Sequence, residues 1–355
     1  FLIIWAYLIL NIFLSSNFNN EFLRQISYIR FIIFAFAICE FIKTKKDFNK
    51  IFKVWLVIFI IVFADLIYEK IYGVNFLGFE SPNKLRLVGF LKDELKIAYI
   101  ITGFCFLISG HLLNTKKINY LAVIFLLLTI AIIFITGERS NFLKSIIFLF
   151  FFIFFIFNKD LKKFFLINLL SLLLIVSLFS IIKTSNSLYS QFYERLFLKD
   201  ENNKINIYKN LKEISPHAAH FDASIKIAND YPFFGAGIKN FRYICADKKY
   251  ETKKYSSGQI CTTHPHQVYF EVISEAGYLG LIFFVLPFFI FINRNVKIFI
   301  KNQNYVHLAG ILIIFIHFLP FLPSGSIFTN TTGLILWLNI GFVLASSNLK
   351  NSSTN

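Results

Sequence analysis

The sequence predicts an all-α fold, a polytopic bundle of transmembrane helices with one long polar segment outside the bilayer. Hydrophobic residues make up 56% of the 355 residues, and Phe alone occurs 48 times. A soluble domain of this size cannot bury so much apolar surface, so lipid must be the solvent for most of the chain. Apolar windows that are separated by charged loops recur along the sequence and support this fold class.

Ten of these windows are long enough to cross a bilayer as helices. They lie at about 1–16, 27–42, 51–68, 95–113, 119–136, 141–157, 163–183, 277–292, 305–320 and 327–346. We therefore expect four parts in order along the chain: N-terminal transmembrane helices at 1–183, a periplasmic loop at 184–265 that contains short helices, C-terminal transmembrane helices at 266–346, and a disordered tail at 347–355. The chain lacks Met and opens within an apolar run, so we expect its N-terminus to be truncated.

Basic residues cluster in alternate loops, which predicts the orientation. If every window is one crossing, these clusters share one face: Lys43, Lys45, Lys46, Lys50, Lys116, Lys117, Lys159, Lys162, Lys163, Arg294, Lys297 and Lys301. The positive-inside rule makes that face cytoplasmic. The loops at 69–94, 136–141, 184–265 and 320–326 then lie outside.

The net charge of +16 comes from 36 basic and 20 acidic residues. In a soluble protein this excess would suggest nucleic acid as a partner. Here the cytoplasmic loops account for much of it, so we expect membrane lipids and no nucleic acid. The basic residues outside the membrane suit an anionic, lipid-linked substrate.

The external segment contains the signals of a small water-facing domain. Ser215-Pro216 is typical of an N-cap followed by the first helical residue, and predicts a helix to about Asn229. Gly235-Ala236-Gly237 predicts a turn; it is no nucleotide-binding fingerprint, because no strand precedes it. Two cysteines of this segment, Cys245 and Cys261, would gain about 3 kcal/mol from a disulfide in an oxidising compartment. The alternative is two free thiols.

No metal site is expected in this segment. The sequence has no Cys-x-x-Cys motif, and the helically spaced pair His217 and His220 has no evident third ligand beside it.

The run His264-Pro265-His266-Gln267 lies where the polar segment re-enters the membrane. Thr263 or His264 can cap a helix whose first residue is Pro265. His266 would then lie in the first helical turn, where the positive end of the helix dipole keeps the imidazole neutral and able to accept a proton. The alternative is a cluster that only caps the helix. Further along, Gly277 and Gly280 would let a neighbouring helix or lipid chain approach closely.

Two arginines outside the membrane are candidates for binding phosphate. Arg139 lies in the short turn Thr136–Ser140 between two apolar windows, where its planar guanidinium suits a diphosphate. Arg86 lies before the fourth window, together with Glu94, whose carboxylate can orient a sugar hydroxyl. Snorkelling at the interface is the alternative for Arg139, and solvated loop charges are the alternative for Arg86 and Glu94.

These motifs resemble those of the O-antigen ligase / O-antigen polymerase family of bacterial envelope enzymes. His266-Gln267, nine residues and Gly277-x-x-Gly280 match its signature, Gly137-x-Arg139-Ser140 matches its arginine turn, and 232–241 matches its Pro-x-x-Gly-x-Gly…Phe element. Many members carry an Arg about four residues before a Trp ahead of that element, where this chain has His217 and Phe221. His217, His220 or Arg242 is expected to replace that arginine. Members usually have about twelve spans.

The resemblance implies a glycosyltransferase-type enzyme of lipopolysaccharide biosynthesis in the inner membrane, with an active site that faces the periplasm. It would transfer a glycan from undecaprenyl diphosphate to a sugar hydroxyl with inversion, without a cofactor or metal. His266 and Arg139 would be catalytic, and His264 and Gln267 would bind substrate. The acceptor would be lipid A core for a ligase or a second lipid-linked glycan for a polymerase.

Two other classes of protein remain open. A transporter or flippase for the same lipid-linked glycan would place ionisable groups near the membrane midplane and often shows inverted repeats. A scaffold for envelope assembly would tolerate changes at His266 and Arg139.

Overall fold

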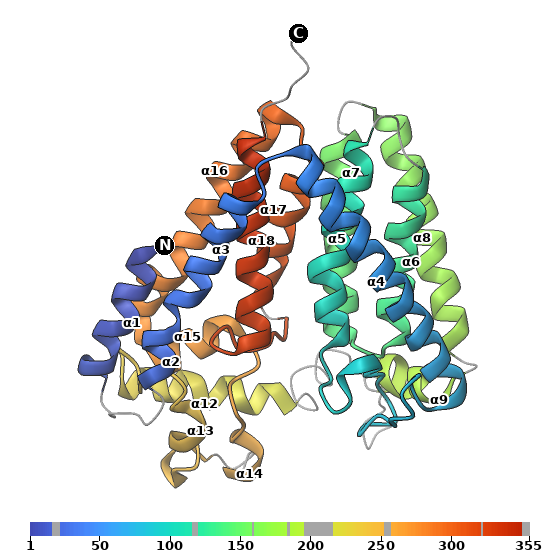
Figure 1. Ribbon diagram of the computed structural model, residues 1–355. Helices are drawn as coiled ribbons and strands as arrows, with labels where there is room; N and C mark the ends of the chain where they lie inside the picture. The colour runs from blue at the N-terminus through green and yellow to red at the C-terminus, as the bar shows by residue number, and fades with distance from the viewer. Residues whose placement is uncertain are drawn as a thin grey trace. The chain divides into compact units, whose positions relative to one another are not determined.

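The computed structural model describes residues 1–15, 22–115, 120–157, 160–182, 185–194, 216–251, 257–320 and 322–349 (Figure 1). These residues are helical and form no sheet, which confirms the all-α fold class. Ser215, Lys116, Lys117, Lys159 and the tail from residue 350 lie outside the described residues. The chain divides into two compact units, and each unit is described by itself.

The first unit comprises Phe1–Ile38, Ile207–Lys297 and His317–Gly341. It combines N-terminal helices, much of the external segment and C-terminal helices. Its longer helices are α1 (Leu2–Leu14), α2 (Phe22–Ser27), α3 (Ile29–Phe41), α12 (Pro216–Asp230), α15 (Val268–Gly280), α16 (Leu286–Asn302) and α18 (Asn330–Asn348), and α3, α16 and α18 continue past its limits. A single π-helical turn, η5 (Leu281–Val285), joins α15 to α16.

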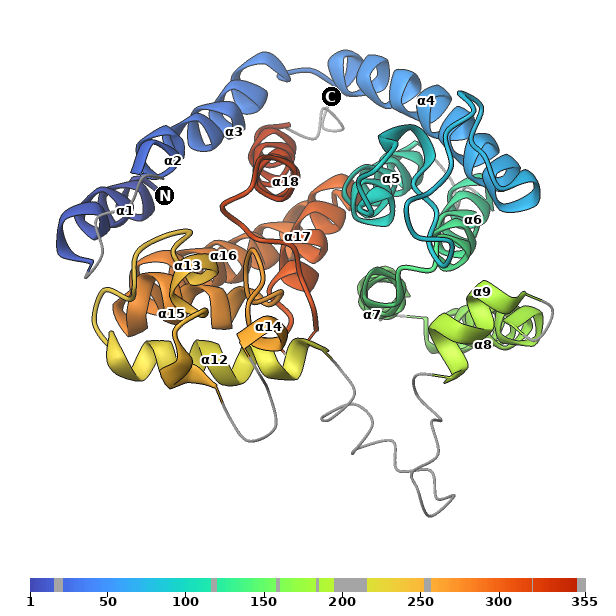
Figure 2. The ribbon, with the colours of Figure 1, turned by 90° about the horizontal axis from the view of Figure 1, so that it is seen from below.

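Helix α12 forms where the sequence predicts it, from Pro216 to Asp230. It packs against α15, and both views show the two helices side by side, with the short helices α13 (Phe241–Ile244) and α14 (Ser257–Ile260) beside them (Figures 1 and 2). A small core joins these elements. It consists of Ala219, Ala223, Ile227, Ala236, Phe241, Cys245, Tyr250 and Ile260. The described part of the polar segment at 184–265 therefore has a hydrophobic interior of its own.

A disulfide between Cys245 and Cys261 closes this small core. Cys245 ends α13 and is fully buried, and Cys261 directly follows α14. The bond therefore fixes the chain just ahead of the His264–Gln267 run.

The second unit comprises Cys39–Asn206, Ile298–Ile316 and Phe342–Asn355. Its helices are α4 (Lys45–Tyr72), α5 (Ile97–Asn114), α6 (Tyr120–Ile135), α7 (Arg139–Phe157), α8 (Leu161–Ile182), the short α9 (Asn186–Leu188) and most of α17 (Tyr305–His317). Consecutive helices from α4 to α8 pack against each other (Figure 1). Thr44 and Asp47 form a capping box at the start of α4, and Gly73 ends it in the left-handed conformation.

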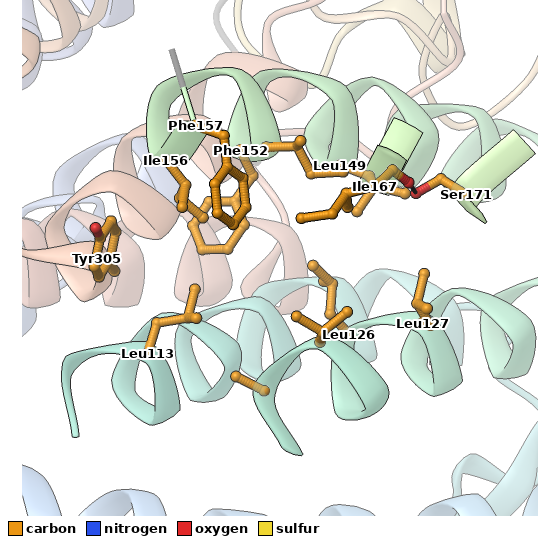
Figure 3. Close-up of a pocket in the computed structure, with 13 residues that line it drawn as sticks. Leu113, Leu126, Leu127, Leu149, Phe152, Ile156, Phe157, Ile167, Ser171 and Tyr305 are labelled. Carbon is orange, nitrogen blue, oxygen red and sulfur yellow. Dashed lines mark hydrogen bonds between the residues drawn. The ribbon is translucent and has the colours of Figure 1, made fainter. Parts of the chain in front are cut away.

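A cavity of about 250 Å³ lies among the helices of the second unit (Figure 3). Its lining comes from α5, α6, α7, α8 and α17 and is almost entirely aliphatic and aromatic. Ser171 and Tyr305 are its polar exceptions. Such a lining suits hydrocarbon.

Five helical stretches are long and apolar enough to cross a membrane, which makes this a multi-pass membrane protein. They are Phe22–Phe41, Lys45–Tyr72, Ile97–Asn114, Arg139–Phe157 and Val268–Asn302, and shorter apolar helices occupy Leu2–Leu14, Tyr120–Ile135, Phe164–Leu178 and Tyr305–His317. Each predicted window falls on a helix. The boundaries differ in places: the window 277–292 lies inside a longer helical stretch, α17 ends at His317, and α18 runs to Asn348, into the predicted tail.

Candidate functional site

Four histidines come together in the first unit at the entrance to α15. His217 and His220 lie three residues apart on α12 and therefore on one helix face, and His264 and His266 come from the loop before α15. The ring of His266 lies in the middle, with its centroid 5.1 Å from that of His217, 5.6 Å from that of His220 and 4.2 Å from that of His264. The expectation that the His217–His220 pair lacks a third imidazole is therefore wrong.

Helix α15 begins later than predicted, which changes the place of His266. The N-cap is Gln267, whose Oε1 accepts hydrogen bonds from the backbone N–H of Tyr269 at 2.8 Å and of Phe270 at 3.1 Å. His266 precedes the cap in the left-handed conformation with φ = 60°. The prediction of a cap at Thr263 or His264 is therefore wrong, because the Gln267 amide satisfies the first helical N–H groups itself.

Gln267 is also unsuited to its predicted contact with substrate. Its side chain is 1% exposed, and its oxygen is occupied by the helix cap. The role it fills is to fix the direction in which α15 leaves the histidine loop.

Burial, with a smaller contribution from the neighbouring His264 and His220, lowers the pKa of the His266 imidazole from 6.5 to about 3. The imidazole is therefore neutral near pH 7, as predicted. The cause differs from the predicted one, since His266 precedes the helix and is desolvated by its surroundings. Burial also lowers the pKa of His220, whose Nδ1–H donates to the carbonyl of Ile260 at 2.9 Å.

The polar groups around His266 hold the loop in place. Its carbonyl accepts a hydrogen bond from the Ser324 N–H at 2.8 Å, and its Nε2 lies 3.3 Å from Thr262 Oγ1. Arg242 on α13 donates to the carbonyl of Thr263 at 3.4 Å, which brings a predicted substrate-binding cation next to the histidines. His264 Nδ1 lies 3.0 Å from Thr263 Oγ1.

Neither glycine after the histidine motif makes the predicted close contact with a neighbouring helix: Gly277 meets the loop at 232–237, and Gly280 packs within its own helix. Gly277 has φ = 71° and ψ = −177°, a conformation that is almost restricted to glycine, and it interrupts α15. A Cβ at Gly277 would collide with the backbone of Phe233 and Gly235. Gly280 is helical and packs on the side chains of Ala276 and Val272 within α15.

Backbone hydrogen bonds join the two motifs across this contact. The N–H groups of Ala236 and Gly237 donate to the carbonyls of Ser274 and Glu275, both at 2.9 Å. In the other direction, the Tyr278 N–H donates to the carbonyl of Pro232 at 2.7 Å. The break in α15 thus frees backbone groups that the Pro232–Gly237 loop satisfies.

Sequence reasoning missed a buried ionic cluster beside this contact. Lys239 is 0% exposed; its Nζ lies 3.4 Å from Glu271 Oε1 and also contacts Ser326 Oγ. The backbone N–H of Lys239 donates to Glu275 Oε2 at 2.8 Å, and the Ile327 N–H donates to Glu271 Oε2 at 3.2 Å. The signal in the sequence was a pair of glutamates four residues apart in an otherwise apolar helix, since such groups need a partner when buried.

In the second unit, Arg139 is the first residue of α7, directly after the turn Thr136–Glu138. Gly137 has φ = 77°, and a Cβ there would lie 2.5 Å from the carbonyl oxygen of Leu85. The Leu87 N–H donates to the carbonyl of Thr136 at 3.0 Å. This contact brings together the two segments that carry Arg86 and Arg139, the predicted phosphate-binding residues.

Arg86 faces a buried carboxylate. Its Nη2 lies 3.7 Å from Oε2 of Glu138, which is 3% exposed and also accepts from Asn141 Nδ2 at 2.6 Å. Burial raises the pKa of Glu138, and the charge of Arg86 opposes this rise. Glu94, by contrast, is exposed and forms an ion pair with Lys96 at 2.6 Å. This is the arrangement expected of a solvated loop charge.

The fold and these contacts define a helical membrane protein with a histidine cluster on a polar segment between spans. The model of the O-antigen ligase family matches residues 123–285, a stretch that contains Arg139, all four clustered histidines and Gly280. The resemblance inferred from the motifs is therefore confirmed over this stretch. Among curated proteins, none matches the chain at a significant level.

Proposed function

We propose that the protein transfers a glycan from a polyprenyl diphosphate to a sugar hydroxyl on the periplasmic side of the inner membrane, as an O-antigen ligase. The match to the O-antigen ligase family supports the assembly of lipid-linked glycans as the general activity. The observation that carries the specific chemistry is the neutral, half-buried imidazole of His266 at the centre of a polar cluster within the matched stretch. A neutral imidazole has the lone pair that a general base needs.

In the proposed reaction, the acceptor hydroxyl gives its proton to His266 while its oxygen attacks the anomeric carbon. The bond between that carbon and the diphosphate oxygen breaks, its electron pair leaves with the polyprenyl diphosphate, and the configuration inverts. The negative charge of the departing diphosphate raises the proton affinity of a nearby imidazole, which favours proton transfer at this stage.

Cationic side chains would stabilise the departing diphosphate without a metal ion. Arg139 stands at the N-terminus of α7, where the helix dipole also favours an anion. In the histidine cluster, Arg242 offers a guanidinium close to the loop of His264. We assign binding of the donor diphosphate to Arg139 and Arg242. His217 and His220 would assist, since they lie where many members of the family carry an arginine.

The proposed topology has ten crossings, with the basic loops in the cytoplasm. The five long stretches and the shorter apolar helices support this number, and the alternation of basic loops supports the orientation. It places the polar segment with the histidine cluster in the periplasm. The Cys245–Cys261 disulfide agrees with that oxidising compartment.

The test is transfer by purified protein in detergent with a polyprenyl-diphosphate-linked oligosaccharide. Rough lipopolysaccharide is offered as acceptor in one reaction, and a second lipid-linked chain in the other. We expect one-step attachment to the lipopolysaccharide, seen as a single increase in product size. Growth of the lipid-linked chain into a ladder would instead identify a polymerase, and absence of product with both acceptors would contradict the transferase and favour transport.

A further inference from the structure

The cluster around His266 contains a set of donor atoms that the proposed transfer reaction does not use together. His217, His220 and His266 each offer one ring nitrogen, and these three atoms lie within 4.8 Å of one another. Two come from one face of α12 and the third from the loop before α15, so the set depends on the packing of α12 against α15.

The spacing is close to that of an occupied metal centre. Three nitrogens that bind one Zn²⁺ tetrahedrally at about 2.0–2.1 Å lie roughly 3.4 Å apart. Rotation of the side chains that moves the nitrogens together by up to about 1.4 Å would bring the set from 4.8 Å to this distance. His217 lies in the first turn of α12 and His266 in the loop before α15, so neither is held in the middle of a helix.

One imidazole is already oriented as metal ligands usually are. A carbonyl oxygen can only accept, so Nδ1 of His220 carries the proton that is donated to Ile260 O at 2.9 Å. Its Nε2 therefore keeps its lone pair for a ligand, which is the arrangement that holds most metal-bound histidines in place. The Ile260 carbonyl is itself fixed, because the next residue, Cys261, is bonded to Cys245.

The chemistry of the donors selects the kind of ion. All three are imidazole nitrogens, which bind Zn²⁺, Co²⁺, Ni²⁺ and Cu²⁺ well, whereas Mg²⁺ and Ca²⁺ prefer oxygen ligands. Three ligands leave a fourth tetrahedral position open to water.

We propose that His217, His220 and His266 bind one divalent transition-metal ion of the Zn²⁺ type. A consequence, which rests on the proposed function, is inhibition of transfer. The ion takes the imidazole lone pair that His266 would offer to the acceptor proton, so occupancy by metal and action as a base exclude each other.

Binding is tested on the purified, metal-stripped full chain in detergent by titration with Co²⁺, followed by visible absorption, with Zn²⁺ as competitor. We expect one Co²⁺ per chain with the spectrum of a tetrahedral site, displaced by Zn²⁺. His217→Gln and His220→Gln should each weaken binding by about 100-fold or more, since loss of a second-shell partner alone costs roughly 10–100-fold. His264→Ala is the matched control, which removes an imidazole from the same cluster and should retain the site.

His217→Gln keeps the test valid if His220→Gln fails to fold, because His217 lies in the first turn of α12 and is less buried than His220. No Co²⁺ binding to the folded wild type, or equal binding by wild type and His217→Gln, would overturn the site and leave the proposed transfer reaction untouched.

Inhibition is tested separately by adding Zn²⁺ to the transfer reaction and then removing it with EDTA. We expect the rate to fall at the Zn²⁺ concentration that fills the site and to recover on chelation, while residual transfer by His217→Gln should be far less sensitive. Stoichiometric binding without inhibition would overturn the inhibition and the role of His266 as base, but not the metal site.

Discussion

The backbone N–H of Tyr278 donates to the carbonyl of Pro232 at 2.7 Å, so the break in α15 is closed by a loop that lies far away in the sequence. This bond requires Gly277 to leave the helical conformation, and it brings the Pro232–Gly237 loop and the histidine motif into one structure. The family signature therefore contains a residue needed for packing, Gly277, as well as the candidate catalytic residue His266. The break at Gly277 anchors the loop that follows α12 to α15, and so helps to fix the packing of α12, which carries His217 and His220 at its other end, against α15.

Gly277→Ala should destabilise the protein strongly. Its φ and ψ lie in a region almost restricted to glycine, which costs about 1–3 kcal/mol for another residue, and the added Cβ collides with Phe233. We expect a clear fall in the thermal unfolding temperature in detergent. Gly258→Ala is the control, because nothing lies within 4 Å of a Cβ there. Equal unfolding temperatures of the two variants would show that the break at Gly277 does not bear on stability.

Local signals in the sequence were sufficient for much of the fold. A helix forms at each of the predicted apolar windows, and Pro216 predicted the start of α12 through its missing N–H and preset φ. Both signals depend on residues near each other in the chain, so they need no knowledge of tertiary contacts.

The details of the site depend on contacts between distant segments, which one sequence does not contain. His217 and His266 meet only because α12 packs on α15, and the conformation of Gly277 is set by the loop at Phe233. Lys239 follows a Gly-rich turn and resembles a solvated loop residue, yet the glutamates of α15 draw it into the interior. The cap at Gln267 was missed because Pro265 offered a stronger local signal two residues earlier.

His266→Asn should abolish most of the transfer activity while preserving the fold. Asn tolerates the left-handed φ of 60° better than other residues, so the substitution removes the base with little backbone strain. Loss of a general base typically lowers the rate by about 10²–10⁴-fold. Transfer from a lipid-linked oligosaccharide is measured together with thermal unfolding, and His264→Asn should lose less activity than His266→Asn. A folded His266→Asn variant that transfers glycan at the wild-type rate would show that His266 is not the general base.

The same variant should change how stability depends on pH. The pKa of His266 is about 3 in the folded protein and about 6.5 in the unfolded chain, so the unfolded chain binds more protons between these values. The free energy of unfolding therefore decreases as pH falls from 7 towards 4. His266→Asn removes this part of the decrease, while the lowered pKa of His220 leaves a smaller one. Thermal unfolding of the wild type and of His266→Asn at pH 7 and pH 5 measures how the stability of each protein changes with pH. An equal change in both proteins would contradict the burial of a neutral His266.

Lys239→Met should destabilise the first unit by about 3–5 kcal/mol, because it leaves the carboxylate of Glu271 buried without its cation. Adding Glu271→Gln should recover part of this loss, since it removes the carboxylate that has lost its cation. Lys249→Met is the control: its ion pair with Asp230 is nearly half exposed and is worth less than about 1 kcal/mol. Denaturant titration in detergent compares the variants. A loss no greater than that of Lys249→Met would show that the cluster contributes little.

Arg139→Gln should impair use of the lipid-linked donor more than Arg139→Lys. Both remove the planar fork that suits a diphosphate, but Lys retains the charge at the start of α7. A hydrogen bond to a charged group is worth about 1.5–3 kcal/mol, so we expect roughly 10–100-fold lower kcat/KM for the donor with Gln and a smaller loss with Lys. The acceptor KM, measured in the same assay, should change little in both variants. If Gln and Lys perform alike at the wild-type rate, Arg139 is an interfacial arginine and the departing diphosphate is stabilised by other groups.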